Sequence, residues 1–232
     1  MKIISWNLLR RTGAAVHDVA DLIARHRPAV LLMQEATKEM EGLPELAGGV
    51  IYRRRLPGRI HGLAVWTPDP LARPKTLMLP VSTLPGALPP RVAQLVRVGE
   101  MTIANVHLSH GQILNRLQLM TIADAIDGPA AVIGDYNAVG PILLPGFRDV
   151  GPRKPTHHAR NVVPFRLDRC LVRGLECSRA HVLERGPSDH RPIVLDLKIG
   201  ETAAARPRRR WRLRLTAAKM PAAAPAPAPK AA

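Results

Sequence analysis

The sequence predicts an α/β fold, and three observations support this prediction. The chain has 232 residues, enough for one domain with a sizeable core, and its 46% hydrophobic content is typical of a globular protein. Short apolar runs of strand length recur along the chain, and helical patterns separate several of them. Several runs end at a polar side chain, and in α/β folds that position lies at the edge of a sheet, where ligands usually bind.

The most informative strand is the apolar run 130–133. Gly134 follows it, then Asp135 and, two residues later, Asn137. We expect Gly134 to allow a sharp turn where the strand stops, and Asp135 and Asn137 to share one face of an extended segment. An ionised acceptor beside a neutral amide suits the binding of a water and a phosphate oxygen. An Asx turn that only closes a loop is the structural alternative.

The other elements follow from periodicity and from chain breakers. Residues 92–98 and 101–108 are expected to form a hairpin, and so are 166–172 and 176–183. The helix from residue 111 is expected to bury Ile113, Leu117 and Met120 on one face, residues 71–92 to form edge strands and loops, and residues 138–165 to form a long loop. The remaining expected strands are 2–6, 29–33, 61–66 and 193–199, and the remaining expected helices are 14–27 and 39–46.

Polar residues at or within these strands are the candidate functional groups. Asp189 and His190 precede the last strand with basic neighbours and give the second strong signal. Each residue also has a structural explanation: Asn7 as a helix cap, Glu35 as a solvated side chain, and a lone histidine as a structural group. The candidates are Asn7, Glu35, His107, Asp135, Asn137, Asp168, Asp189 and His190.

The chain is strongly basic, with a formal net charge of +16. This charge points to polyanionic partners, such as nucleic acid or anionic lipid head groups. Residues 201–232 contain eight basic residues and one acid, so they carry +7, and residues 1–200 carry the other +9. The Arg53–Arg55 run is either a solvated loop or a collector of phosphates. Only 3% of residues are aromatic, which argues against a broad base-stacking surface.

Composition also predicts domain organisation and compartment. We expect one domain over residues 1–200 and an Ala/Pro/Arg-rich tail over 201–232 that cannot order itself. Two cysteines do not indicate a disulfide framework, and neither a signal peptide nor a membrane span is evident. The expectation is therefore a soluble, cytoplasmic monomer.

In their order along the chain, the polar clusters resemble the endonuclease/exonuclease/phosphatase superfamily, which has the DNase I-like fold. The resemblance spans about residues 1–199, and the Gly-Asp-x-Asn and Ser-Asp-His-x-Pro segments are its most specific parts. The matching segments are Ser5-Trp6-Asn7, Leu32-Met33-Gln34-Glu35, Asn105-Val106-His107-Leu108, Gly134-Asp135-Tyr136-Asn137, Arg166-Leu167-Asp168 and Ser188-Asp189-His190-Arg191-Pro192.

The resemblance implies a four-layer sandwich, with two packed mixed β-sheets flanked by helices. It also implies hydrolysis of a phosphate ester with a divalent cation, Mg²⁺ or Mn²⁺. The implied metal ligands are Glu35, Asn7 and Asp189, with Glu35 the main one. The implied catalytic residues are Asp135, held by Asn137, as the base; His190, oriented by Asp168; and His107 as a second phosphate contact. Candidate substrate-binding residues are Arg53, His61 and Arg191.

Two departures from the family pattern narrow the function. No acidic residue lies between Leu46 and Pro68 to steady His107, as happens in the DNase branch. In the abasic-site endonuclease branch a Thr-Lys pair follows Gln-Glu and a tyrosine replaces His107, so that function is disfavoured. A metal-dependent nuclease is the preferred hypothesis. A phosphatase or phospholipase C-type enzyme acting on a lipid or small phosphoester comes second, and a binding protein with an inactive site comes third.

Overall fold

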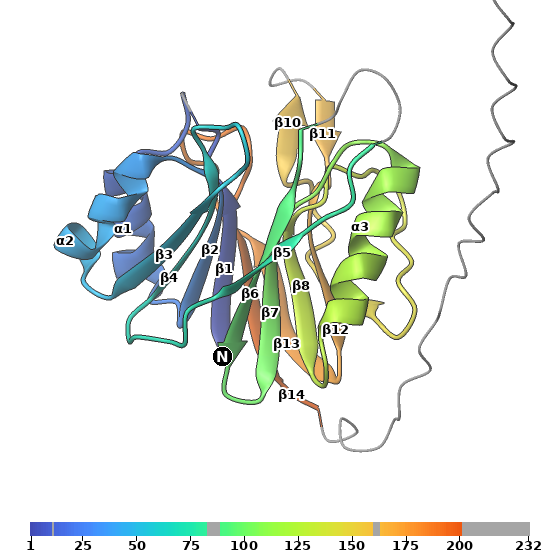
Figure 1. Ribbon diagram of the computed structural model, residues 1–232. Coiled ribbons are helices and arrows are strands. Elements are labelled where there is room, and N and C mark those ends of the chain that lie inside the picture. Colours follow the sequence, from blue (N-terminus) through green and yellow to red (C-terminus); the bar gives the residue numbers. More distant parts are fainter. Residues whose placement is uncertain (11, 83–88, 160–162, 201–232) are drawn as a thin grey trace, which may run out of the picture.

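Two six-stranded sheets pack face to face, and helices cover both outer faces (Figure 1). The computed structural model describes residues 1–200, apart from 11, 83–88 and 160–162. The predicted tail 201–232 lies outside the described residues, so the domain boundary predicted near Gly200 stays a prediction. The layers agree with the predicted four-layer sandwich.

The first sheet contains both ends of the described chain. Its central strand β1 pairs parallel with β2 and antiparallel with β14, so residues far apart in sequence meet at its middle. The strand order is β13 (Leu175–Val182), β14 (Ile193–Ile199), β1 (Lys2–Asn7), β2 (Val30–Ala36), β4 (Gly62–Thr67) and β3 (Val50–Arg55).

The second sheet is built from the middle of the chain. The β6–β7 hairpin predicted around Gly99 is present, and β7 then pairs parallel with β8. The strand order is β5 (Lys75–Met78), β6 (Val92–Val98), β7 (Met101–His107), β8 (Ala130–Asp135), β12 (Asp168–Arg173) and β9 (Arg148–Asp149). A separate hairpin, β10 (His157–Ala159) and β11 (Val163–Phe165), stands at one end of the sandwich (Figure 1).

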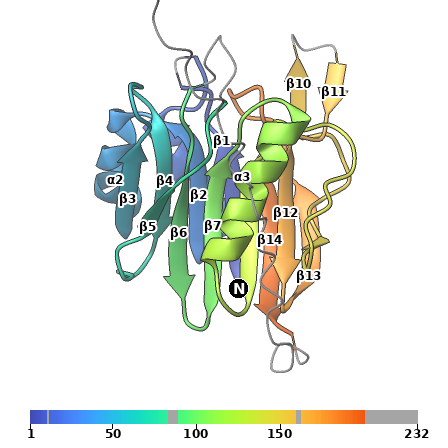
Figure 2. The same cartoon turned by 45° about the vertical axis from the view of Figure 1, so that its right-hand side comes forward.

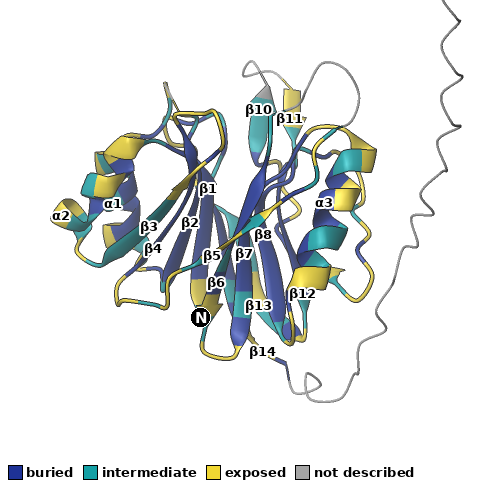
Figure 3. Ribbon diagram, in the orientation of Figure 1, coloured by how far each residue is buried: buried dark blue, intermediate teal, exposed yellow. Residues whose placement is uncertain are grey.

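Three large apolar clusters hold the layers together, beside a small one formed by Leu56, Leu63 and Val92. The inner faces of both sheets bury one cluster, which includes Ile3, Leu32 and Ile133. α1 (Val16–His26), the 3₁₀-helix η1 (Lys38–Gly42) and α2 (Leu43–Ala47) cover the first sheet. α3 (Gln112–Ala125) covers the second sheet, as Figure 2 shows. The central strands β1, β2, β4, β7, β8 and β12 are buried along most of their length (Figure 3), whereas β3, β5 and β13 are partly exposed. None of the described helices is long and apolar enough to cross a membrane.

Two predictions about pairing were wrong. Strand β13 does not pair with β12; it pairs with β14, because the chain crosses from the second sheet to the first at Gly174, whose φ is 63°. Arg53–Arg55 do not form a loop, because they continue β3 alongside β4.

A third wrong prediction concerns the buried face of α3. Ile113 and Leu117 are 81% and 43% exposed, whereas Asn115 and Gln118 are buried. The two amides face the sheet because buried backbone groups need them. Asn115 donates to the carbonyls of Ser109 and Tyr136, and Gln118 donates to the carbonyl of Pro80 and accepts from the Ser109 amide.

Candidate active site

The candidate active site lies where the two sheets meet, at the end of the sandwich that carries the β10–β11 hairpin. His107, Asp135 and Asp168 form one row across the second sheet, since Asp135 pairs with His107 on β7 and with Asp168 on β12. Asn7 ends β1 in the first sheet and donates its amide to Asp135 Oδ2 over 2.9 Å. One buried hydrogen bond thus joins the two sheets at the carboxylate.

Gly134 positions Asp135 by close approach of strands, not by the expected turn. It lies within β8 with φ of 142°, and a Cβ there would lie 2.1 Å from the carbonyl oxygen of Val106. Asn137 has φ of 48°, so it does not share an extended face with Asp135. Its backbone N–H donates to Asp135 Oδ1 over 2.8 Å, and its side chain donates to the carbonyl of Leu108. An Asx turn therefore holds Asp135 from behind.

His190 faces the same carboxylate from the loop before β14. Its Nδ1 donates to Asp168 Oδ2 over 2.8 Å, and its Nε2 lies 3.8 Å from Asp135 Oδ2. Burial alone would lower the pKa of His190, but the charges of Asp168 and Asp135 outweigh burial and raise it to about 10. The imidazole is therefore cationic at neutral pH.

Residues of β1 hold the His190 loop in place. Trp6 Nε1 donates to the carbonyl of His190 over 2.9 Å. The hydroxyl of Ser188 donates to the carbonyl of Asn7 and accepts from the backbone N–H of His190. The Ser-Trp-Asn and Ser-Asp-His segments, about 180 residues apart in sequence, thus form one hydrogen-bonded unit.

Glu35 occupies a strained backbone position at the rim of the site. Strand β2 does not end before Glu35 as expected; it continues to Ala36 through a β-bulge in its pairing with β4, and Glu35 has φ of 55°. A non-glycine residue in this conformation costs about 1–2 kcal/mol and is often associated with function. The backbone N–H of Arg10 donates to Glu35 Oε2, and Oε1 has no hydrogen bond within the described residues.

The carboxylates offer free oxygens to a hard cation. Besides Glu35 Oε1, a buried oxygen of Asp189 has no partner in the described part of the chain. However, Asp189 groups with His157 and His190 as potential metal ligands, and Glu35 is not in that group. His157 Nε2 lies 3.3 Å from Asp189 Oδ2, and this interaction lowers the pKa of Asp189 although burial opposes the shift. Sequence reasoning missed His157.

Two neutral histidines, His107 and His61, and the buried Arg91 line the side of the candidate site opposite His190. Burial lowers the pKa of His107 to about 3, although Asp135 lies 3.5 Å away and opposes the shift. Burial, together with the charges of Arg10 and Arg91, lowers the pKa of His61 to about 4. Arg91 is only 8% exposed, and its guanidinium makes no hydrogen bond or ion pair among the described residues. Its charge interacts most with Asp135 and Glu35, so it is a candidate phosphate contact that sequence reasoning missed.

Two predicted substrate-binding residues are engaged elsewhere. Arg53 forms an ion pair of 2.8 Å with Glu41 at the β3 edge of the first sheet. Arg191 donates its Nε to the carbonyl of Leu183. Of the three predicted contacts, only His61 lies beside the candidate site, where its Nε2 is 3.5 Å from Arg10 Nη1.

Comparison with known proteins shows the family to which the chain belongs. The sequence model of the Endonuclease/Exonuclease/phosphatase family matches residues 4–190. The chain belongs to this family. Members of the family hydrolyse phosphoesters and are generally dependent on divalent metals. No curated protein matches the chain.

Solved structures share the fold at low sequence identity. A Bacteroides vulgatus endonuclease/exonuclease/phosphatase is 17% identical with a TM-score of 0.68, over 85% of this chain and 98% of the other. The Bacteroides thetaiotaomicron mannosyl-6-phosphatase is 15% identical with a TM-score of 0.64, over 86% and 100%. A humanized D. rerio TDP2 is 18% identical with a TM-score of 0.63, over 85% and 98%. These similarities support the DNase I-like sandwich.

Proposed function

We propose that this protein is a divalent-metal-dependent nuclease that hydrolyses phosphodiester bonds in nucleic acid. The observation that carries the proposal is the linked set Asn7–Asp135 and His190–Asp168, in which two carboxylates and an imidazolium converge from both sheets. Such a set combines an oriented acceptor for a water proton with a cationic donor for a phosphoryl oxygen.

In this proposal Asp135 orients the attacking water and removes its proton. Asn7 and the Asn137 N–H hold the carboxylate in one orientation. His190, fixed by Asp168, donates from Nε2 to a phosphoryl oxygen, and neutral His107 donates from the other side. The water oxygen then bonds to phosphorus as the ester P–O bond breaks.

Glu35 would hold the divalent cation, with Asn7 and Asp189 in support. The free oxygens of Glu35 and Asp189 fit a hard cation, and Mg²⁺ or Mn²⁺ prefers such ligands. When bound, the cation neutralises charge on the phosphate and the leaving oxygen. Removing the metal with a chelator should therefore abolish turnover.

The basic charge supports nucleic acid as the substrate. The net charge of +16 matches a phosphate backbone. A phosphatase or phospholipase C-type activity is the second candidate, and the similarity to a mannosyl-6-phosphatase favours it.

A substrate screen tests the proposal. Purified protein with Mg²⁺ or Mn²⁺ should cleave plasmid DNA or RNA faster than nucleotides, sugar phosphates or phospholipids.

Asp135→Asn should lower kcat by about 10²–10⁴-fold. Glu35→Gln should lose metal-dependent turnover while melting at the same temperature, because the side chain lines a surface pocket and the amide keeps its shape. Exclusive turnover of monoesters would contradict the nuclease assignment, and normal activity of Glu35→Gln at limiting Mg²⁺ would contradict the metal assignment.

A further inference from the structure

The outward face of α3 exposes aliphatic side chains that have no partner within the described fold. Ile113 and Leu117 lie one turn apart and are 81% and 43% exposed. Val139 and Leu143, in the segment that follows the site, are 57% and 71% exposed. Gln112 donates to the carbonyl of Val139, which joins this segment to the start of α3. Four of the large exposed aliphatic residues therefore gather in one region outside the active site.

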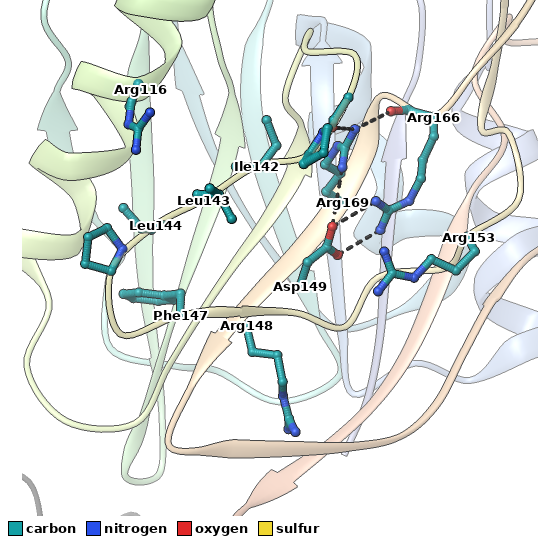
Figure 4. Close-up of a pocket in the computed structure, with 13 residues that line it drawn as sticks. Arg116, Ile142, Leu143, Leu144, Phe147, Arg148, Asp149, Arg153, Arg166 and Arg169 are labelled. Carbon is teal, nitrogen blue, oxygen red and sulfur yellow. Dashed lines mark hydrogen bonds and ion pairs between the residues drawn. The ribbon is translucent and has the colours of Figure 1, made fainter.

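A basic pocket of about 880 Å³ lies in this region, lined by Arg116 of α3 and by Leu143 among others. Figure 4 shows its lining residues. Five arginines and a single aspartate line it. Arg166 and Arg169 both bind that aspartate, Asp149, and Arg169 also donates to the carbonyls of Ala138 and Gly140. These two arginines therefore hold the pocket wall in shape and are not free for a ligand.

The other three arginines of the pocket have no partner in the part of the chain that the structure describes. Arg116 comes from α3, Arg148 from β9 and Arg153 from the segment after it, and all three are exposed. None of their guanidinium groups has a hydrogen bond or an ion pair in the described residues. Three unpaired cations from three segments surround a pocket that Leu143 also lines, so the region presents positive charge and aliphatic surface together.

We propose that this region is a docking face for an anionic phospholipid surface, with the pocket receiving a head-group phosphate. We call it the α3 face, and define it as Ile113, Arg116, Leu117, Val139, Leu143, Arg148 and Arg153. Arginines attract anionic head groups, and aliphatic side chains enter the acyl boundary. The proposal does not depend on which phosphoester the active site hydrolyses.

Other occupants fit the α3 face less well. A nucleic-acid strand would need aromatic rings for its bases. The aromatic ring that lines the pocket, Phe147, is already covered by the guanidinium of Arg173, 4.8 Å from its centroid. A second copy of the chain, related by two-fold symmetry, would bring the same cations together. Lipid is the occupant that uses both the cations and the aliphatic groups.

Vesicle binding by the full chain tests this proposal. Binding to vesicles of phosphatidylcholine with phosphatidylglycerol is compared with binding to phosphatidylcholine alone. In one variant, Arg116→Gln, Arg148→Gln and Arg153→Gln are combined. Its control combines Arg25→Gln, Arg27→Gln and Arg97→Gln, three exposed arginines elsewhere in the described fold, and removes the same charge. We expect the α3-face variant to bind anionic vesicles roughly 100-fold more weakly, and its control to lose less.

A second pair of variants separates lipid insertion from charge. Ile113→Ser with Leu143→Ser should weaken binding at least about tenfold, even at high salt. Leu46→Ser with Met78→Ser changes exposed aliphatic residues elsewhere and should have no effect. Unchanged melting temperature and unchanged turnover of a small soluble phosphodiester establish that each variant is folded.

Three results would overturn the proposal. The first is equal binding to vesicles with and without phosphatidylglycerol. The second is equal loss in the α3-face variants and their controls, which would assign binding to net charge alone. The third is loss of single-stranded nucleic-acid binding with vesicle binding retained, which would make nucleic acid the occupant.

Discussion

At the residue scale, the site depends on a few buried side chains whose charges are balanced locally. His190 is cationic beside two carboxylates, whereas His107, across Asp135 from it, is held neutral by burial. The same carboxylate therefore has a charged and an uncharged imidazole within 4 Å. We therefore expect His190 to contact a phosphate as a cationic donor and His107 to contact it as a neutral donor.

The Asp168–His190 pair should behave as one unit. Asp168→Asn is expected to lower kcat less than His190→Ala, because it acts only through the orientation and charge of the imidazole. In the double variant, Asp168→Asn should add little to the loss caused by His190→Ala. Steady-state kinetics of the four proteins measures this, and fully multiplicative losses would argue against coupling.

Arg91 should lower the stability of the fold and strengthen substrate binding. A buried guanidinium without an ion pair is unfavourable, so Arg91→Met is expected to keep or raise the melting temperature. The same change should raise KM for a phosphodiester, because the positive charge opposite Glu35 and Asp135 is lost. Calorimetry and kinetics measure the two effects, and a clear drop in stability would reveal an internal partner for Arg91.

His61 and His107 should make the fold sensitive to acid. Both have folded-state pKa values, about 4 and about 3, below the ordinary 6.5. As the pH falls below 6.5, the unfolded state takes up protons that the folded state cannot, so the free energy of unfolding falls. For His61 the loss between pH 6.5 and 5 is on the order of 1–2 kcal/mol.

Urea unfolding at pH 7, 6 and 5 tests this sensitivity. His61→Gln should unfold with a shallower pH dependence than the parent protein. His17→Gln, at an exposed position of α1, is the matched control and should keep the parent slope. Identical slopes for the parent and His61→Gln would show that His61 titrates normally in the folded state.

At the scale of elements, strand ends and irregularities position the functional groups. The bulge in β2 gives Glu35 its left-handed backbone, and the tight β7–β8 contact at Gly134 sets the height of Asp135. Beneath them, Gln34 donates to Ser5 Oγ and to Asn105 Oδ1, while Asn105 donates to the carbonyls of Met33 and Ala64. This buried network fixes the register between the sheets.

Gly134→Ala should be strongly destabilising. A Cβ would lie 2.1 Å from a backbone oxygen of the neighbouring strand, so the two strands must separate. We expect a loss of more than about 3 kcal/mol in the free energy of unfolding. Gly128→Ala is the control, since Gly128 has φ of 69° but open space around it, and should cost about 1 kcal/mol. Equal losses in urea unfolding would contradict the steric explanation.

At the scale of the whole molecule, basic charge is divided between the domain and the tail. Residues 201–232 hold +7 of the total +16. We propose that this segment raises the local concentration of a polyanion without taking part in the chemistry.

Truncation after Gly200 tests the role of the tail. Folding and kcat on a small phosphodiester should not change. Nucleic-acid binding should weaken at low salt, and the plot of log K against log[salt] should flatten by about 0.9 per lost phosphate contact. An unchanged affinity and slope would leave solubility as the function of the tail.

The sequence by itself determined most strands of the two large sheets and the polar residues at their ends, but not the short strands β9, β10 and β11, which lie in the segment 138–165 that was expected to be a loop. Asn7, His107 and Asp135 end their strands as their local patterns indicated, because apolar runs and breakers act over a few residues. The resemblance added the layers and the pairing of Asp168 with His190, whose hydrogen bond is present.

Only the tertiary structure decided which side of each element is buried and which residues contact one another. The period of α3 did not reveal that Asn115 and Gln118 would turn inward, because their partners are backbone groups of other segments, Pro80 and Tyr136, and of Ser109 just before the helix. The sheet that β13 joins, the approach of Arg91 to the carboxylates and the pairing of His157 with Asp189 also depend on contacts across the fold. The local sequence pattern determines whether a segment is a helix or a strand. The surface against which that segment packs determines which of its faces is buried.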